Sequence, residues 1–503
     1  MFNKVNKFAK AVVTVAMAGL MAVGCAADMG EVDLVQPDYI KKSDLLNKTW
    51  YYRRTVVDTS ENHQPFLSIG TGDLFTIMRI KFDIQENVLV GYTDYEFVEG
   101  TEEAGDEGSV FTDYGNPIVA FPITKHFDIA RQYDSSTGQP TNVISENSSD
   151  NEWFDRDYMR VNWSADLMSH NFFVLDVKSY PVTGGRWLGE NQEPANPYRA
   201  RFTPDEGYFD FTTAHTMMPD WYQCLYEYGF SWFTCGAGES RVRHSFMQMD
   251  EQEAAAYKPL DYPDTVPVLD ANGAEVLDPE TGEVRRSKVW ERFGYYRLER
   301  LTYDDYRGLT ESGRLNKIIR FNIWEKSVDE LGQDIPYGKR TPKPIIYYLN
   351  WDFPADLLET AQEVAAEWNG VFKRTVASLQ GKAEADVPDM FILKQNSCAM
   401  DSVNAYLAAH SELKADVNGA VVSPMSESTL GNYCSALEYY SRKAGVTDPF
   451  VWQQAGDIRF NMLYWITQKT PAGFSGYGPM LGDPVSGLNV VSTANIMGWT
   501  IDS

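Results

Sequence analysis

The last residues of the chain, 476–503, read GYGPMLGDPVSGLNVVSTANIMGWTIDS. This stretch decides how the C-terminal third folds, because glycines and a proline separate two runs that are rich in apolar and β-branched residues. It predicts a strand, a polar turn at DPVSG (483–487), a second strand over 488–496 and the start of a helix. A strand that leads directly into a helix is typical of a mixed α/β sheet.

Earlier segments supply the rest of that sheet. The run IIYYL, residues 345–349, predicts a short apolar strand. Pro354 suits the first turn of a helix, where its missing N–H costs nothing. Apolar side chains then recur at i+3/i+4 spacing over 357–372, which predicts one apolar stripe along a helix of about six turns. Further predicted elements are helices over 401–409 and 430–443 and a strand over 457–466.

Residues 49–340 differ in composition from this region. Short runs rich in Tyr, Val, Ile and Phe alternate with Gly, Asp, Asn and Pro, and the first of them is TWYYRRTVV (49–57). Such runs, separated by turn signals, predict strands and a β-rich region. The predicted fold class is therefore α+β: a large β-rich N-terminal region, followed from about residue 341 by an α/β domain built of a sheet plus a long helix.

A polar turn occurs twice within residues 268–284, VLDANGAEVLDPETGEV. This repetition favours a hairpin that links neighbouring strands. The alternative is a calcium loop, in which Asp270, Asn272 and Asp278 would supply oxygen ligands. The spacing of these residues does not match the EF-hand pattern, which makes the hairpin the preferred interpretation.

The N-terminus predicts a lipoprotein signal peptide over residues 1–24. Three lysines precede the apolar run Ala11–Val23, whose 13 residues are fewer than the roughly 20 that a transmembrane helix needs. The sequence Val-Gly-Cys at its end resembles a bacterial lipobox, which implies lipid attachment at Cys25; an ordinary signal peptide with a chance cysteine is the alternative. Ala26 matches the pattern sorted to the outer membrane. We therefore expect an outer-membrane lipoprotein of the cell envelope, periplasmic or surface-exposed, with a tether over 25–48.

Substitution of the lipidated residue tests this expectation. Cys25→Ser should release the protein from the membrane fraction or mislocalise it, because a serine at this position accepts no lipid on sulfur. Fractionation and mass spectrometry of the mature N-terminus would measure the effect. An unmodified Cys25 within the mature wild-type chain would show that the lipobox interpretation is wrong.

Four cysteines remain in the mature chain: Cys224, Cys235, Cys398 and Cys434. An even number in an oxidising compartment predicts two disulfides, although four cysteines allow three connectivities. The nearest-neighbour pairing is Cys224–Cys235 with Cys398–Cys434. None of them has the C-x-x-C spacing of zinc ribbons or redox motifs, so we interpret them as structural.

Charge and histidine content limit the chemistry. Removal of three lysines with the signal peptide takes the formal net charge from −27 to −30. Such an acidic protein repels nucleic acid, which makes nucleic-acid binding unexpected. The six histidines include no pair at the spacing of the H-E-x-x-H helix motif. His215 and His244 are the closest pair, and we interpret the histidines as surface or hydrogen-bonded core residues.

Several segments together resemble zincin-type zinc metallopeptidases found as large bacterial lipoproteins. The segment PIIYYLNWDFPADLLETAQEVAAEWNGVF (344–372) resembles their opening strand and helix, and GDIRFNMLYWIT (456–467) with the C-terminal stretch resembles the next strands. Upstream, 142–164, 241–250 and 291–304 resemble their β-rich portion. The resemblance implies a β-rich region over 49–340 and the N-terminal part of a zincin-like domain over 341–503, with an insert at 381–450.

In this family the strand after the DPVSG-type turn lies along the active-site cleft and pairs with bound peptide. The resemblance therefore implies a substrate-edge strand made of Leu488, Asn489, Val490, Val491, Ser492, Thr493, Ala494, Asn495 and Ile496. The zinc ligands and the catalytic glutamate would lie on the next helix and beyond. Since no H-E-x-x-H motif occurs before Ser503, we assign no catalytic or metal-binding residue, and expect zinc only in a complete family member.

Two hypotheses about function follow. The first is the N-terminal part of a lipid-anchored zinc metallopeptidase-like protein, inactive by itself, with the membrane as one partner and a peptide or protein as substrate. The second is a non-catalytic surface lipoprotein that uses the same scaffold to bind a peptide or a partner protein. An incomplete zincin-like sheet would expose an apolar face and an unpaired edge, which favours the first hypothesis.

Overall fold

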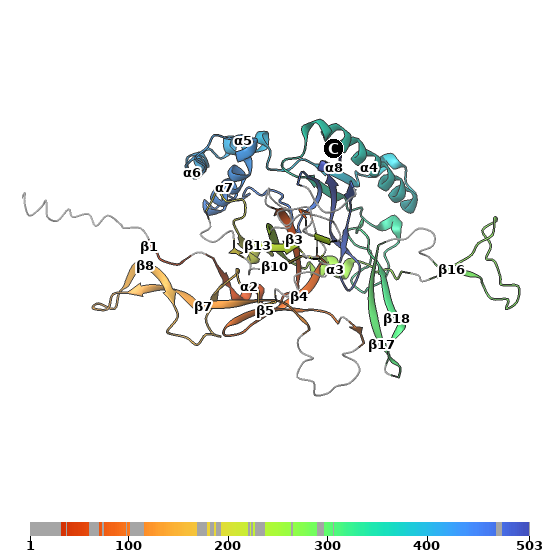
Figure 1. Cartoon of the computed structure of the whole chain (residues 1–503), viewed down its shortest axis with the longest axis horizontal. Coiled ribbons are helices and arrows are strands. Elements are labelled where there is room, and N and C mark those ends of the chain that lie inside the picture. Colours follow the sequence, from red (N-terminus) through yellow and green to blue (C-terminus); the bar gives the residue numbers. More distant parts are fainter. Residues whose placement is uncertain are drawn as a thin grey trace, which may run out of the picture.

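The computed structural model describes residues 32–36, 38–59, 70–72, 75–96, 98–100, 115–168, 179–181, 186–187, 193–219, 222, 225–226, 237–262, 265–288, 296–304, 306–468 and 475–501. The fold is mixed, as predicted, and strands are more numerous than helices. Figure 1 shows a large curled sheet beside a smaller C-terminal sheet that carries the long helix. We refer to residues 32–340 as the β-rich unit and to residues 341–501 as the C-terminal unit.

One sheet of 13 strands forms most of the β-rich unit. The main path runs β1-β8-β7-β5-β4-β3-β14-β13-β10, and neighbouring strands are antiparallel except β1 and β8. The strands are β1 (Val32–Asp33), β2 (Tyr39–Lys41), β3 (Trp50–Thr59), β4 (Met78–Ile84), β5 (Val88–Thr93), β7 (Pro117–Tyr133), β8 (Pro140–Asn147), β9 (Tyr158–Val161), β10 (Ser179–Pro181), β11 (Arg186–Trp187), β12 (Arg201–Thr203), β13 (Tyr208–Pro219) and β14 (Gly238–Gln248).

Aromatic side chains fill the core of this sheet. The rings of Phe209 and Phe246 stack with centroids 4.3 Å apart, and Trp50 meets Phe209 edge-on at 5.4 Å. Burial of such rings contributes more than the same area of aliphatic surface, because ring pairs add about 0.5–1.5 kcal/mol each. Ile40 and Leu45, which fall within the expected tether, are also buried in this core. In the part of the chain that the structure describes, packing against this core therefore begins at about residue 39.

Two hairpins project from the β-rich unit (Figure 1). One consists of β17 (Arg297–Asp304) and β18 (Gly308–Ile318), with β6 (Val98–Glu99) beside β17. The other consists of β15 (Thr265–Pro267) and β16 (Arg286–Lys288) and includes the double turn of residues 268–284.

Residues 268–284 extend the hairpin of β15 and β16, which agrees with the preferred interpretation of this segment as a hairpin. Asp270 accepts hydrogen bonds from the backbone N–H groups of Asn272 and Ala274, and Asp278 does so from Glu280 and Thr281. These backbone hydrogen bonds lower the pKa of both carboxyls. Both carboxylates therefore stabilise turns.

The C-terminal unit contains a sheet of six strands in the order β20-β19-β21-β24-β22, with β23 also on β24. The first four strands are parallel to one another, and β22 and β23 are antiparallel to β24. The strands are β19 (Ile345–Leu349), β20 (Phe391–Lys394), β21 (Asn461–Ile466), β22 (Gly476–Tyr477), β23 (Met480–Gly482) and β24 (Asn489–Met497). The sequence prediction missed β20, which lies inside the expected insert, and began β21 four residues early.

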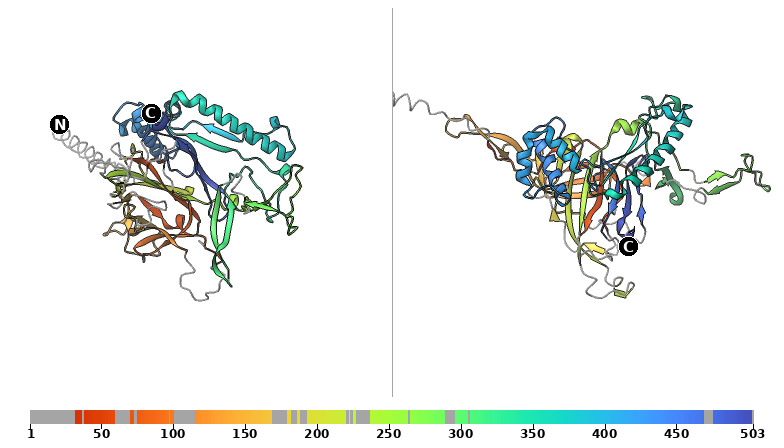
Figure 2. Two further views of the ribbon diagram at one scale, coloured as in Figure 1. Left: turned by 45° about the vertical axis from the view of Figure 1, so that its right-hand side comes forward. Right: turned by 90° about the horizontal axis from the view of Figure 1, so that it is seen from above.

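Most of the helices belong to the C-terminal unit, whereas the short helices α2 and α3 belong to the β-rich unit. Helix α4 connects β19 to the parallel strand β20, and Figure 2 shows it running across one side of the sheet. A cluster of three shorter helices follows β20. The helices are α2 (Lys42–Leu45), α3 (Glu251–Ala256), α4 (Leu358–Gln380), α5 (Met400–Ala409), α6 (Lys414–Ala420), α7 (Leu430–Lys443) and α8 (Gly498–Ile501), with 3-10 turns at Pro204–Glu206, Tyr337–Lys339, Ala355–Leu357, Glu384–Asp386, Ser411–Leu413 and Glu427–Thr429.

The predicted apolar stripe of α4 is only partly buried. Ala361 and Ala365 are buried. Val364, Trp368 and Val371, on one flank of the stripe, keep 49%, 52% and 45% of their surface exposed. The reason is that α4 packs mainly over the outer strands of the sheet, so this flank has no described element against it.

Candidate functional site

The DPVSG turn connects the two units. The Asp483 carboxylate is buried and accepts the backbone N–H groups of Val485 and Ser486 at 3.0 and 2.6 Å. The Tyr51 hydroxyl of β3 donates to the same carboxylate at 3.0 Å. Gly487 closes the turn with φ +74°, and a Cβ there would lie 2.4 Å from the Ile318 carbonyl oxygen. The motif therefore has a structural role that its sequence alone does not reveal.

The expected substrate-edge strand is present as β24, but it is not an edge. On one side, Met462–Ile466 of β21 pairs with Thr493–Met497. On the other side, β22 and β23 pair with residues between Asn489 and Ile496. The expectation of a free edge at 488–496 is thus corrected, because the Gly- and Pro-rich segment before the turn folds back along the strand. Among the described strands, β22 and β23 form the outer edge on this side.

A short gap exists in the sheet where β21 begins. The register pairs Tyr347 with Asn461, so β19 extends two residues beyond the start of β21. The side chain of Asn461 bridges the strands on either side: its Nδ2 donates to the Ile346 carbonyl at 3.0 Å, and its Oδ1 accepts from Ser492 N–H at 2.8 Å. The side-chain amide of Asn461 thus makes the two hydrogen bonds that a backbone peptide group of β21 would otherwise make at this position. Further toward the start of β24, Arg320 pairs with this side of the chain: its N–H donates to the Gly487 carbonyl at 3.1 Å, and its carbonyl accepts from Asn489 N–H at 2.9 Å.

A cavity of about 420 Å³ is lined both by Asn461 and by Phe321 and Asn322, which follow Arg320, and we call it the interface pocket. It lies between the gap and the β-rich unit, which contributes Tyr51 and Met247 to its walls. Three residues of the predicted substrate strand, Leu488, Asn489 and Val490, line the opposite wall. These three residues therefore share one surface, although Asn489 also pairs with Gly482, and the remaining six lie farther along β24.

A larger cavity, of about 980 Å³, lies in the β-rich unit beside β4 and β5. Several of its charged groups are paired with one another: Asp94 faces Arg79 and Lys81, and Arg300 lies 2.7 Å from Glu99. Residues 101–114, which connect two glycines of its wall, lie outside the described residues. We do not assign a ligand to it.

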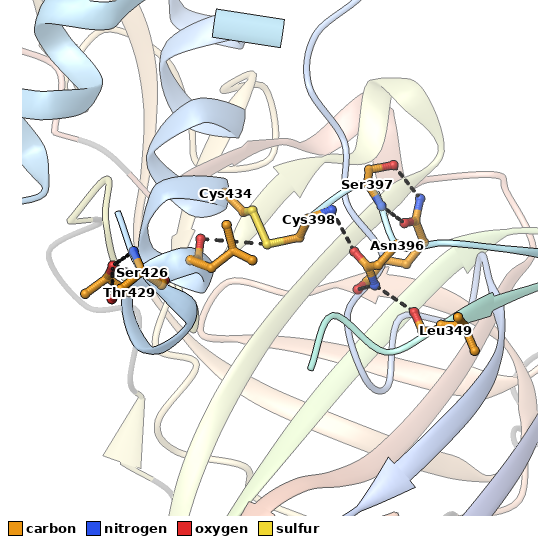
Figure 3. Close-up of a disulfide and its surroundings, with 9 residues drawn as sticks. Leu349, Asn396, Ser397, Cys398, Ser426, Thr429 and Cys434 are labelled. Atoms are coloured by element: carbon orange, nitrogen blue, oxygen red, sulfur yellow. Dashed lines mark hydrogen bonds between the residues drawn. A yellow bond between two sulfur atoms is a disulfide. The ribbon is translucent and has the colours of Figure 1, made fainter. Parts of the chain in front are cut away.

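One predicted disulfide is confirmed. Cys398 and Cys434 are bonded, with Cα atoms 5.7 Å apart, and join the segment after β20 to helix α7 (Figure 3). Asn396, close to the bond, donates to the Leu349 carbonyl at 3.0 Å and so holds the segment at the carboxyl end of β19. Cys25, Cys224 and Cys235 lie outside the described residues, and their assignments stay predictions.

Folding brings together two histidines that are distant in sequence. Thr213 Oγ1 lies 2.8 Å from His215 Nε2 and 3.1 Å from His244 Nε2, and the Tyr52 hydroxyl lies 2.9 Å from His244 Nδ1. Burial and the Arg54 charge lower the pKa of His215 to about 4 and hold the pKa of His244 well below its usual range. Both are hydrogen-bonded core residues, as the sequence interpretation proposed.

A buried group of charges also joins the two units. Arg201 of β12 contacts Glu438 of α7 at 3.1 Å, Asp457 at 2.9 Å and Asp210 of β13 at 3.4 Å. Burial alone would lower the pKa of Arg201, but the carboxylates, Glu438 most, raise it overall. Burial would raise the pKa of Asp457, but Arg459 and Arg201 lower it overall. We call Arg201, Asp210, Glu438 and Asp457 the Arg201 cluster.

The described residues do not assemble a metal site. Among them, no group of three or more His, Cys, Asp or Glu side chains could hold a metal ion. Within the same part of the chain, no helix is long and apolar enough to cross a bilayer. Comparison with protein-family models, with curated proteins and with solved structures found no match.

Proposed function

We propose that residues 341–503 form the N-terminal part of a zincin-like metallopeptidase domain, carried on the outer membrane by a lipid at Cys25. The observation that carries this proposal is the path of the chain after the DPVSG turn. Strand β24 joins a parallel strand on one side and short antiparallel strands on the other, and it leads directly into α8. In the family that the sequence resembles, the catalytic helix follows this strand.

The start of α8 is held close to the sheet. Gly498 lies against the Trp465 ring, where a Cβ would come within 2.3 Å of Trp465 Cε2. A larger residue would push the helix away from β21. The glycine thus supports the idea that a helix follows β24 in close contact with the sheet.

One face of the sheet is incompletely covered: Leu349 and Trp465 on this face are buried, but other apolar residues are not. Leu463 of β21 and Ala494 and Ile496 of β24 are only half-buried, although they are apolar and lie in the middle of the sheet. This face lies on the same side as Leu349 and Asn461, and the flank of α4 with Trp368 is also uncovered. Apolar surface of this kind favours a packing partner. A helix that continues from α8 would be suited to both surfaces.

The coding sequence after Ser503 tests the proposal. We expect an H-E-x-x-H motif within about a hundred residues, in any reading frame. The longer product should bind one zinc ion and cleave casein, and Glu→Gln within the motif should abolish cleavage while zinc binding persists. Zinc content by mass spectrometry and a peptidase assay would measure both properties.

The chain that ends at Ser503 is the matched control. It should bind no zinc at a defined site and cleave no peptide. Tight binding of one zinc with casein hydrolysis by this chain would contradict the proposal. A downstream sequence without the motif would favour the alternative, a non-catalytic surface lipoprotein that binds a peptide or partner.

A further inference from the structure

The hairpin of β7 and β8, with β1 beside β8, forms one end of the β-rich unit. Figure 1 shows β1 and β8 at one end of the long axis of the molecule and β16 at the other end. The last paired residues before the turn of this hairpin are Tyr133 and Pro140, and the turn comprises residues 134–139. We call residues 131–145 the hairpin tip.

Strand β1 begins close to the hairpin tip. It is parallel to β8, with Val32 opposite Val143, and Leu34 N–H donates to the Ile144 carbonyl at 2.9 Å. Because β8 runs away from the turn, β1 does so too, and Val32 is the end of β1 nearest the turn. Seven residues lead from Cys25 to Val32, and a chain of this length spans at most about 25 Å. A lipid at Cys25 would therefore bring the hairpin tip within reach of the membrane.

The hairpin tip carries little charge for so acidic a protein. Of the 71 acidic residues in the sequence, only Asp134 lies in the tip, and Arg131 is its one basic residue. The Asp134 carboxylate accepts the backbone N–H of Ser136 at 2.8 Å, and Asp33 of the neighbouring β1 accepts that of Val35 at 2.9 Å. The formal net charge of the full sequence is −27, so the protein as a whole is repelled by anionic headgroups. The tip has no net charge and is suited to approach a lipid surface.

Apolar side chains extend into solvent at the same end of the molecule. Tyr133, the last residue of β7, is 68% exposed, and Val32 and Leu34 beside β8 are 41% and 55% exposed. Val32 and Leu34 are two residues apart in an extended segment, so their side chains lie on one face. A tyrosine suits the boundary between membrane and water, where its ring contacts apolar groups and its hydroxyl stays hydrated.

We propose that the hairpin tip lies on the surface of a bilayer of zwitterionic lipids, with the Tyr133 ring at the level of the headgroups. This position depends on the proposed lipid at Cys25, which supplies the tether. One tyrosine is a weak membrane anchor, but a tether that keeps the tip close to the surface raises its effective concentration there. The hairpin of β15 and β16 would then lie at the end of the molecule farthest from the bilayer (Figure 1).

The test compares two exposed tyrosines that lie beside or within hairpin turns. Tyr306, in the turn between β17 and β18, is 94% exposed and is the matched control. Tyr133→Cys and Tyr306→Cys are labelled with a fluorophore in the lipidated full chain, and the labelled wild type serves as the blank for its own cysteines. In phosphatidylcholine vesicles with a quencher at the headgroup, we expect at least about twofold quenching of the label at position 133 and none at position 306.

A second arm separates the position of the tip from lipidation. The same variants, with Cys25→Ser and a hexahistidine tag in place of residues 1–24, are bound to vesicles through a nickel-chelating lipid and should show the same difference. Failure of the lipidated chain to bind vesicles would contradict the anchor at Cys25, and the tagged chain would still decide where the tip lies. Gln139→Cys, on the other side of the turn, replaces Tyr133→Cys if that variant does not fold. Equal quenching at both positions, or quenching at neither, would overturn the proposal.

Discussion

Arg201→Ala is expected to lower the free energy of unfolding by about 3–5 kcal/mol, the usual effect of breaking a buried ion pair by removing one partner. Arg201 is 6% exposed, and the three carboxylates that it contacts are buried still more deeply. Asp457 would keep Arg459 as a partner. Glu438 would lose the one cation with which it forms an ion pair among the described residues. An uncompensated buried carboxylate is the main cost.

Urea unfolding would measure this effect, with Arg297→Ala as the control. Arg297 also contacts a carboxylate, Glu299 at 2.9 Å, but its side chain is 38% exposed. Exposed pairs of this kind contribute about 0–1 kcal/mol. Glu438→Gln should restore part of the stability of the Arg201→Ala variant, because it removes the unpaired charge. A loss below about 1 kcal/mol for Arg201→Ala, or no recovery in the double variant, would show that the cluster does not stabilise the fold.

The strands and helices with strong local signals could be predicted from sequence. Residues 345–349 and 430–443 form elements with the predicted bounds, because turn residues flank each apolar pattern. The strand Phe391–Lys394 was missed since its four residues do not alternate in polarity. It becomes a strand only because α4 returns the chain beside β19, and the sequence around Phe391 gives no sign of this.

The interface pocket could not be predicted, because its existence depends on where β21 begins. Apolar residues suggested a strand from Asp457, but this carboxylate instead pairs with Arg201, which is 256 residues away. Arg459 donates to the same carboxylate and holds the turn. A contact between distant charges thus delays the strand and leaves the gap. The local sequence pattern around Asp457 gives no information about an ion pair with a residue so distant in the sequence.

The sequence does contain a signal for the position of His215. Phe209, Phe211, Thr213 and His215 alternate with other residues along β13, which places them on one face of a strand. Phe209 and Phe211 belong to the aromatic core, so this face is turned toward that core, although the residues between them are buried as well. Only the pairing of Phe211 with His244 across β13 and β14 could not be read from the sequence, since register depends on a long connection.

Acidification is expected to destabilise the protein between about pH 6.5 and pH 5, before most carboxylates titrate. His215 and His244 are neutral in the folded state because burial and Arg54 lower their pKa values. In the unfolded chain they take up protons near pH 6.5. The unfolded state therefore binds more protons, so stability is complete above this pH and is lost as pH falls. Each histidine contributes about 1.4 kcal/mol per pH unit in this window.

Urea unfolding at several pH values would measure the slope, which should approach about 2.7 kcal/mol per pH unit for the two histidines together. His215→Gln should reduce it by about half, because glutamine can still place a nitrogen near Thr213 but does not titrate. His410→Gln is the control, since this side chain is 29% exposed and lies beside Glu412. The comparison concerns slopes, so a lower stability of the variant at neutral pH does not affect it. An unchanged slope in His215→Gln would mean that this histidine is not held neutral by the fold.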